Sequence, residues 1–453
     1  MKDTTGQRKR AVVVGASLAG LVAARVLRDH FDEVLIVERD HVPDGPEARG
    51  GVPQAKHIHV LLVRGAQILE ELFPGIRDEL IGGGAPTVDW PSEVLWLAPA
   101  GWVQRTGSPF ELISASRDFL DWTVRTRVLA HDGVRLLDEN DAIGLLAAAP
   151  RSRVTGVTVR SRADGTLTQL EADLVVDASG RNSHASEWLG TLGYPLPRES
   201  VVNAFLGYSS RVYEPPAGIE VDWKGIVLTS RPPDEKRAGV LFPLNGGLWH
   251  VTLVGTGHDY PPTDEPGFIE FARTLRSPIL HDVLAGARPV TSISGYRRTE
   301  NQLRHFEQMG SFPDGFVVLG DAASAFNPVY GQGMSVAGLS GLVLKRWLED
   351  GGPSATFQRR LAKAVATPWL LATSEDFRFP TTVGGRRNAM TKLMHRYIDR
   401  VIAVATVDNV VLDTFIGVVH LVRPPSALFH PAIAARVLRG PRRQAPNEPP
   451  PAP

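Results

Sequence analysis

The sequence has 453 residues, of which 43% are hydrophobic and 22% are charged, a composition typical of a globular protein with two or three domains. It holds 49 basic and 49 acidic residues, and this balance argues against nucleic acid or an anionic membrane surface as the main partner. The lack of cysteine excludes disulfides, thiolate metal sites, a cysteine nucleophile and a redox-active cysteine pair. No segment has the pattern of a targeting peptide or a membrane span, so we expect a soluble, cytoplasmic protein.

The N-terminal part of the chain predicts a strand, a turn, a helix and a second strand. Residues 11–14 form a β-branched run, apolar residues recur at helical spacing over 18–27, and residues 34–37 form a second apolar run. A strand, a helix and a strand in this order indicate a parallel sheet that is buried on both faces.

The turn between the first strand and the helix, residues 15–20, has a pattern typical of dinucleotide binding. Gly15 allows the tight turn, Gly20 lets the helix pack against the strand, and Glu38 ends the second strand as an acceptor for ribose hydroxyls. Ser17 replaces the usual middle glycine, and its small side chain still allows a phosphate to approach. Two other interpretations stay open: an ordinary tight turn, and a nucleophile elbow in which Ser17 serves a hydrolase.

A second candidate ligand-binding segment lies far along the chain. Gly320 and Asp321 follow an apolar strand, and a loop rich in Pro and Gly, residues 328–334, then leads into a helix. An acid at the end of a strand can accept hydrogen bonds from a polyol, and a helix N-terminus places positive potential beside an adjoining ring. A simple strand-end turn would also show a Gly-Asp pair, so this segment gains its meaning from the first motif.

Two stretches differ in residue composition and pattern from the apolar strands described above. Residues 85–113 are rich in Trp, Pro and Gly, and residues 239–254 have the pattern of a hairpin around an Asn-Gly turn. The Trp residues could line an apolar pocket or serve ordinary sheet packing. The predicted organisation is a discontinuous nucleotide-binding domain (1–84, 114–194 and 301–350), a substrate domain (85–113 and 195–300), a C-terminal helical region (351–440) and a disordered tail (441–453).

The sequence resembles the FAD-dependent group A monooxygenases, the class that includes the aromatic-ring hydroxylases. The resemblance rests on residues 15–20 with Glu38, residues 177–180, and residues 320–321 with 328–334. More narrowly, residues 51–59 and 325–334 resemble actinobacterial flavin-dependent polyketide epoxidases of polyether ionophore pathways. The implied fold class is α/β: a Rossmann-like FAD-binding domain with an inserted antiparallel-sheet substrate domain and C-terminal helices.

The resemblance also implies which residues hold FAD. Glu38 would bind the adenosine ribose, Arg117 would approach the phosphates, and Asp321 would bind the ribityl chain. The same resemblance implies no metal and identifies no catalytic residue. The full implied set is Gly15, Ser17, Leu18, Ala19, Gly20, Glu38, Arg39, Arg49, Gln54, Arg117, Ala142, Asp177, Ser179, Gly180, Gly320, Asp321, Pro328, Gly331, Gln332, Gly333 and Met334.

The resemblance implies chemistry that runs through the cofactor. Reduced FAD would react with O₂ to a C4a-hydroperoxide, which transfers one oxygen atom to an apolar secondary metabolite by epoxidation or hydroxylation. No second glycine motif follows a strand, so either NAD(P)H visits the flavin or a separate flavin reductase supplies the electrons. A reductase or a halogenase-like enzyme on the same scaffold is the alternative, although the Trp-x-Trp-x-Ile signature of halogenases is absent.

The roles of His57 and His59, which form a His-x-His pair in a loop, stay open. No carboxylate or thiol spacing beside them supports a metal site. They could lie near a flavin phosphate or the edge of the ring, or they could be solvated loop residues.

Overall fold

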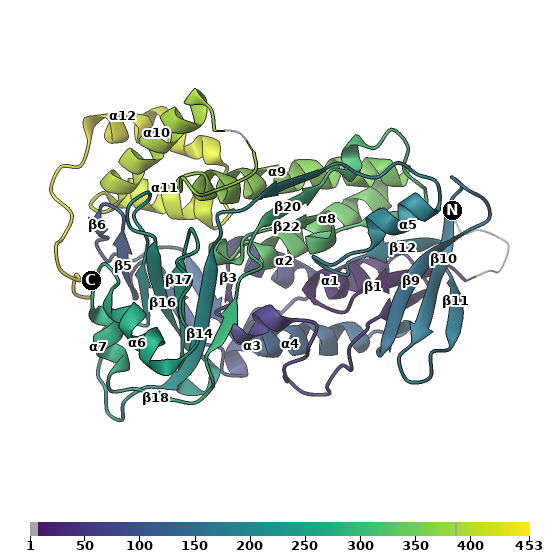
Figure 1. Cartoon of the computed structure of the whole chain (residues 1–453), viewed down its shortest axis with the longest axis horizontal. Helices are drawn as coiled ribbons and strands as arrows, with labels where there is room; N and C mark the ends of the chain where they lie inside the picture. The colour runs from purple at the N-terminus through teal and green to yellow at the C-terminus, as the bar shows by residue number, and fades with distance from the viewer. Residues whose placement is uncertain (1–7, 386) are drawn as a thin grey trace.

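The computed structural model describes residues 8–385 and 387–453 (Figure 1). Its nucleotide-binding part is built on a five-stranded parallel sheet with the order β21, β12, β1, β2 and β8. In β1 and β2 every residue after the first is buried, as expected for central strands of a sheet covered on both faces. The bounds are β1 (Arg10–Val14), β2 (Glu33–Val37), β8 (Val134–Leu137), β12 (Leu174–Asp177) and β21 (Phe316–Val318).

Helices and a small antiparallel sheet cover this parallel sheet. Helix α1 packs on α8, α8 packs on α2 and α9, and the three-stranded sheet β9–β11 contacts the parallel sheet through β10 and β12. The helices are α1 (Leu18–Leu27), α2 (Val63–Leu72), α3 (Ile76–Gly82), α4 (Arg117–Leu129), α5 (Ala185–Thr191), α8 (Gly333–Asp350) and α9 (Ser354–Asp376). The strands are β9 (Asn140–Ala147), β10 (Val154–Ser161) and β11 (Leu167–Glu171).

A second large sheet has eight strands drawn from two separate stretches of the chain. Strands β5 (Val94–Ala98) and β6 (Gly101–Trp102) join β14 (Gly207–Glu214), β15 (Gly225–Leu228), β16 (Arg237–Leu244), β17 (Leu248–Gly255), β18 (Arg288–Pro289) and β19 (Ser294–Tyr296). The predicted hairpin forms, with β16 and β17 paired around residues 245–247. The sheet is antiparallel except for β15 and β5, which are parallel, so the inserted sheet is mixed. No short turn joins these two strands, and their direction is therefore free of the hairpin constraint.

Helices cover the second sheet on both sides of its strands. Helices α6 (Glu265–Arg273) and α7 (Ile279–Leu284) pack on β17 and β16 around a core that includes Phe268 and Leu280. Helices α10 (Ala389–Ala405), α11 (Asn409–Val419) and α12 (Pro431–Arg439) form another cluster, in which Val401 and Val404 pack with Ala98. Figure 1 shows these C-terminal helices at the same end of the molecule as β5, β6 and β16. This arrangement confirms the predicted α/β fold class.

Two small sheets connect the larger parts. One pairs β3 (Val60–Leu61), β7 (Glu111–Ser114) and β4 (Thr87–Asp89), and the other pairs β13 (Glu199–Val202), β20 (Asn301–Arg304) and β22 (Ser324–Ala325). They lie where the chain passes between the parallel sheet and the eight-stranded sheet, and the cavity described below lies in the same region.

The C-terminal tail, residues 441–453, lies against the eight-stranded sheet, which we also call the substrate-side sheet. The backbone of Trp102 donates a hydrogen bond to Pro446 O at 3.3 Å, and Ala452 N donates to Asp222 Oδ2 at 2.8 Å. The Arg443 side chain also donates to Gln104 Oε1. The disorder that the proline content suggests stays a prediction. No helix in the described part of the chain combines the length and apolar character needed to cross a membrane.

Candidate functional site

One large cavity of about 1810 Å³ brings the two sequence motifs together. Its lining comes from the ends of the parallel strands, from the eight-stranded sheet and from the C-terminal helices. The predicted residues that line it are Gly15, Ser17, Leu18, Ala19, Glu38, Arg39, Gln54, Arg117, Ala142, Ser179, Gly180, Asp321, Pro328, Gly331, Gln332, Gly333 and Met334.

The glycine turn at the start of α1 forms a cradle that only a residue without a side chain permits. Gly15 has a φ of +102°, and a Cβ at this position would lie 2.6 Å from the carbonyl oxygen of Ala178 on the neighbouring strand. Ser17 is the N-cap of α1, and its Oγ accepts a hydrogen bond from Arg117 Nη2 at 2.9 Å. A helix N-terminus, a bare backbone and a guanidinium therefore converge at one place, which fits a pyrophosphate.

Glu38 lines the cavity beside the glycine turn. Its Oε2 accepts a hydrogen bond from Ala16 N at 2.7 Å, and its Oε1 accepts one from Asp40 N at 3.1 Å. These bonds hold the carboxylate beside the glycine turn and on the cavity wall. A carboxylate has further lone pairs, so it can still accept hydrogen bonds from ribose hydroxyls.

The cavity wall also carries a buried acid and polar atoms that lack hydrogen-bond partners. Burial raises the pKa of Asp321, while the charges of Arg181 and Arg117 lower it. Ser179 Oγ and Gln332 Oε1 are buried and have no hydrogen-bond partner among the described residues. Buried polar atoms are almost always paired, so these two fit a polar group that binds in the cavity.

Two predicted glycines lie behind the cavity wall and shape it. A Cβ on Gly20 would lie 1.8 Å from Gly15 O, so this glycine allows α1 to approach β1. A Cβ on Gly320, which has a φ of +59°, would lie 2.7 Å from the Cβ of Ala19. Neither glycine lines the cavity. Both therefore shape the wall and do not themselves face the cofactor.

Arg49 and Asp177 are also absent from the cavity lining. The resemblance implied that Arg49 binds FAD. In the structure its Nη1 lies 3.2 Å from Glu38 Oε2 and its Nη2 donates to Ala16 O at 2.9 Å, because these two acceptors are buried and need a partner. Asp177 is fully buried and accepts hydrogen bonds from Ser179 N and Ser183 Oγ. Both residues thus support the backbone around the cavity from behind.

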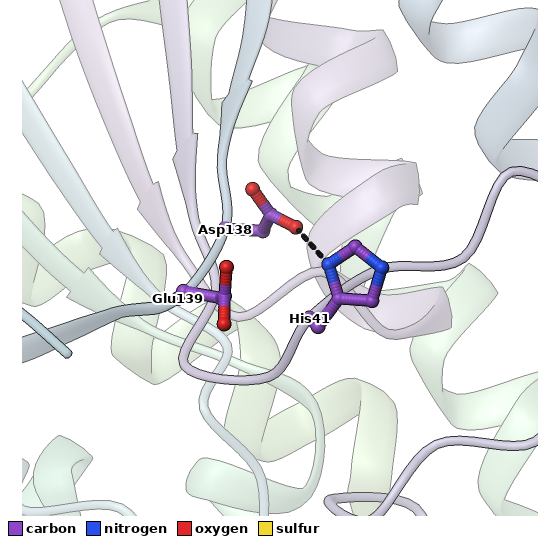
Figure 2. Close-up of side chains that lie close together, drawn as sticks. All are labelled: His41, Asp138 and Glu139. Carbon is purple, nitrogen blue, oxygen red and sulfur yellow. Dashed lines mark ion pairs between the residues drawn. The ribbon is translucent and has the colours of Figure 1, made fainter. Parts of the chain in front are cut away.

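A small group of titratable side chains lies at the surface (Figure 2). It consists of His41, from the loop after β2, and of Asp138 and Glu139, which follow β8. His41 Nδ1 lies 3.3 Å from Asp138 Oδ2, and the same oxygen accepts a hydrogen bond from Val42 N at 3.0 Å. The Asp138 carboxylate therefore fixes the loop that follows β2. Because His41 and Glu139 are exposed and nothing else points to a cation, we assign no metal to this group.

Comparisons with known proteins agree with the site. Residues 11–183 match the family model described as FAD dependent oxidoreductase. The chain is 32% identical over 391 residues to protein Rv3254 of Mycobacterium tuberculosis. This alignment covers 82% of this chain and 81% of that protein. This chain belongs to the FAD-dependent oxidoreductases.

The chain is also similar to more distant proteins with named activities. It is 28% identical over 347 residues to the kynurenine 3-monooxygenase of Salinispora arenicola, covering 73% of this chain and 70% of that enzyme. The solved structure of the flavin-dependent brominase Bmp2 has a TM-score of 0.65 at 15% identity, over 90% of this chain and 92% of that one, and shows the same fold. The chain is an enzyme that depends on FAD.

Membership of this family makes the interpretation of Ser17 as a hydrolase nucleophile wrong. The Ser17 hydroxyl is hydrogen-bonded to Arg117, whereas a nucleophile elbow needs an imidazole base at that position. The Ser17 hydroxyl instead lies at the N-terminus of α1, on the cavity wall.

Replacing Ser17 with Ala is expected to weaken FAD binding only about two- to tenfold, because it removes one hydrogen bond and leaves the helix N-terminus intact. Titration of the apoprotein with FAD, followed by flavin fluorescence, measures the change. Hydrolysis of p-nitrophenyl acetate serves as the comparison, and a specific loss of esterase activity in Ser17→Ala would contradict this assignment.

His57 is buried, so the interpretation of His57 as a solvated loop residue is wrong, and His59 is partly buried on the cavity wall. His57 Nδ1 lies 2.8 Å from Ser210 Oγ on β14, and His59 Nδ1 donates to the carbonyl of His57 at 2.8 Å. Burial, with the nearby charges of His250 and Lys56, lowers the pKa of His57 to about 3. Both imidazoles line the cavity in their neutral form at physiological pH.

The sequence did not reveal a buried network that holds the loop of residues 328–331. The carboxyl of Asp376, at the end of α9, accepts hydrogen bonds from Asn301 Nδ2 at 2.6 Å, Asn327 Nδ2 at 3.2 Å and the Tyr330 hydroxyl at 2.6 Å. Asn301 and two residues of the loop itself, Asn327 and Tyr330, thus donate to one side chain of α9. The network thereby ties the cavity-lining loop to the start of the C-terminal region.

The Asp376 carboxyl gives the protein a specific pH dependence. Burial raises its pKa to about 7, so between pH 4 and pH 7 the folded state holds a proton that the unfolded state has released. The stability of the wild type relative to Asp376→Asn is therefore expected to fall by up to about 1.4 kcal/mol per pH unit from pH 4 to pH 7 and to level off above. Urea denaturation of both proteins across this range measures the difference, and a constant difference would contradict the raised pKa.

Beyond the cofactor residues, the cavity opens into an apolar chamber. Aromatic and aliphatic side chains of the substrate-side sheet form one wall, and residues of the C-terminal helices form the facing wall. The chamber residues include Trp90, Trp96, Val240, Phe242, Met394, Ile398, Ile402, Phe415, Val418 and Leu428. The sequence left open whether the Trp residues line a pocket or serve sheet packing: Trp90 and Trp96 line the cavity, whereas Trp102 is buried in the core. The contribution of the C-terminal helices to the wall was not predicted.

Proposed function

We propose that this enzyme is a monooxygenase that inserts one oxygen atom from O₂ into an apolar secondary metabolite, such as a polyene or a polyketide, by epoxidation or hydroxylation. The observation that carries the proposal is that the predicted FAD residues and the apolar chamber line one continuous cavity. An apolar substrate in the chamber would lie next to the cofactor.

Two sequence likenesses support this proposal. The relative from Salinispora arenicola is a monooxygenase by name, and it aligns over most of the chain. Residues 51–59 and 325–334 resemble polyketide epoxidases, and in the structure both segments contribute to the cavity wall. The likeness favours a polyene or polyketide substrate over a small polar aromatic one.

The residues of this chain hold and orient the reactants. FAD, when bound and reduced, supplies the electrons that activate O₂. Asp321 would hold the ribityl chain, Arg117 would neutralise a phosphate, and the first turn of α8 near Gly333 would place positive potential beside the ring. The apolar walls exclude water, which protects a reactive oxygen donor from unproductive decay. A protein side chain that acts as general base is not required.

The electrons come either from NAD(P)H, which would reach the flavin directly, or from a separate flavin reductase. The sequence has no second dinucleotide motif that would hold NAD(P)H on its own domain. We propose that the enzyme has no nucleic acid or membrane partner, in keeping with its balanced charge.

Labelled oxygen tests the proposed reaction. The purified holoenzyme, reduced by NADPH or by a flavin reductase, is mixed with ¹⁸O₂ and a panel of polyenes and aromatic polyketides, and the products are analysed by mass spectrometry. Incorporation of one ¹⁸O atom into a product supports a monooxygenase. A product that gains only hydrogen indicates a reductase, and a brominated or chlorinated product in the presence of halide indicates a halogenase; either result would overturn the proposal.

A further inference from the structure

The wall of the apolar chamber contains one chain of hydrogen-bonded polar side chains. His57 Nδ1 lies 2.8 Å from Ser210 Oγ, and Ser210 Oγ lies 2.7 Å from Thr252 Oγ1. His57 and Thr252 line the cavity at the two ends of this chain, while Ser210 is 1% exposed and lies between them. We call these three residues the polar relay.

Packing holds the imidazole of the polar relay in place. The ring of Tyr208, which also lines the cavity, meets the His57 ring edge-on with 4.4 Å between centroids. With Nδ1 bonded to Ser210, the other ring nitrogen, Nε2, has no hydrogen-bond partner among the described residues. His57 Nε2 is thus a polar atom without a hydrogen-bond partner on the wall of a largely apolar chamber.

The relay can present either a donor or an acceptor to the chamber. The single proton of the Ser210 hydroxyl can be donated to His57 Nδ1 or to Thr252 Oγ1, but not to both. In the first arrangement the neutral imidazole carries its proton on Nε2 and donates into the chamber, and in the second Nε2 accepts. Ser210 and Thr252 already satisfy one another, so His57 is the member whose second nitrogen still requires a partner.

We propose that the polar relay of His57, Ser210 and Thr252 binds an oxygen-bearing group of the substrate, a hydroxyl or a carbonyl, and thereby sets which part of an apolar chain faces the flavin. The proposal rests on the proposed function, because it takes the chamber as the substrate site. His57 is in these terms a specificity-determining residue and Ser210 a positioning residue that acts through it.

A matched pair of probes tests the relay without a turnover assay. Farnesol and its hydrocarbon counterpart lacking the hydroxyl are titrated into the FAD-loaded protein, and binding is followed by the change in the flavin absorbance spectrum. The wild type is expected to bind farnesol about 2- to 10-fold more tightly than the hydrocarbon, the effect of one hydrogen bond. His57→Phe keeps a ring against Tyr208 but has no nitrogen, and it is expected to bind the two probes equally.

Adjacent serines on β14 provide the control. Ser209 points away from the cavity and its Oγ donates to Pro261 O at 2.9 Å, whereas Ser210 points into the relay. Ser210→Ala is expected to reduce the preference for farnesol, and Ser209→Ala is expected to preserve it. Equal affinity of the wild type for both probes, or binding of neither, overturns the proposal, as does a preference that survives in His57→Phe. Failure of the ¹⁸O₂ experiment alone would leave this binding preference in place, so the two failures are distinguishable.

Discussion

Replacing Asp321 with Asn is expected to give a folded protein that has largely lost its FAD. The side chain borders the cavity at the end of β21, with the charges of Arg181 and Arg117 nearby. A charged acceptor contributes about 1.5–3 kcal/mol per hydrogen bond, so losing its bonds to a polyol is expected to weaken binding roughly 100-fold. Flavin absorbance of the purified protein and a fluorescence titration of the apoprotein measure the loss.

The fold should tolerate this change because the buried charge of Asp321 destabilises the protein when no ligand is bound. Burial raises the pKa of Asp321, which means that the protein resists its charge, and the neutral amide of Asn relieves that cost. Asp132→Asn, at an exposed acid outside the cavity lining, is the matched control and should bind FAD as the wild type does. Stoichiometric FAD in purified Asp321→Asn would contradict the role assigned to Asp321.

The cofactor end of the site could be predicted from the sequence because its constraints are local. Gly15 and Ser17 lie in the turn between β1 and α1, and Glu38 directly follows β2, so one short strand-helix-strand segment carries both the backbone geometry and the chemistry. Arg49 shows the limit of this approach. The sequence places it on the correct loop, but its guanidinium turns to Glu38 and Ala16 behind the turn, and the direction of a long side chain depends on which acceptors are buried nearby.

The substrate end could not be predicted because its partners come from distant segments. His57 and Ser210 are separated by 153 residues and meet only when the loop after β2 packs on the eight-stranded sheet. The Asp376 network joins Asn301, Tyr330 and the end of α9 in the same way. The amphipathic pattern of the C-terminal helices indicates that one face is buried, but it does not identify the surface against which that face packs.

Replacing Gly15 with Ala is expected to destabilise the enzyme strongly and to remove its FAD. The new Cβ would lie 2.6 Å from Ala178 O, a backbone atom of β12's continuation that cannot move without disturbing the sheet. Forcing an L-residue to a φ of +102° adds strain. Together these costs are expected to lower the free energy of unfolding by about 3 kcal/mol or more and to abolish stoichiometric FAD binding.

Gly165→Ala separates the two contributions to this loss. Gly165 also has a positive φ, +75°, but no atom lies within 4 Å of the place where its Cβ would be. This variant should therefore lose only about 1–2 kcal/mol of stability through backbone strain and should retain FAD. Urea denaturation and flavin content of the two variants measure the difference. If Gly15→Ala behaved like Gly165→Ala in both measurements, close approach of the backbone at the turn would not be what the cofactor requires, and the cradle would have to be assigned to other residues.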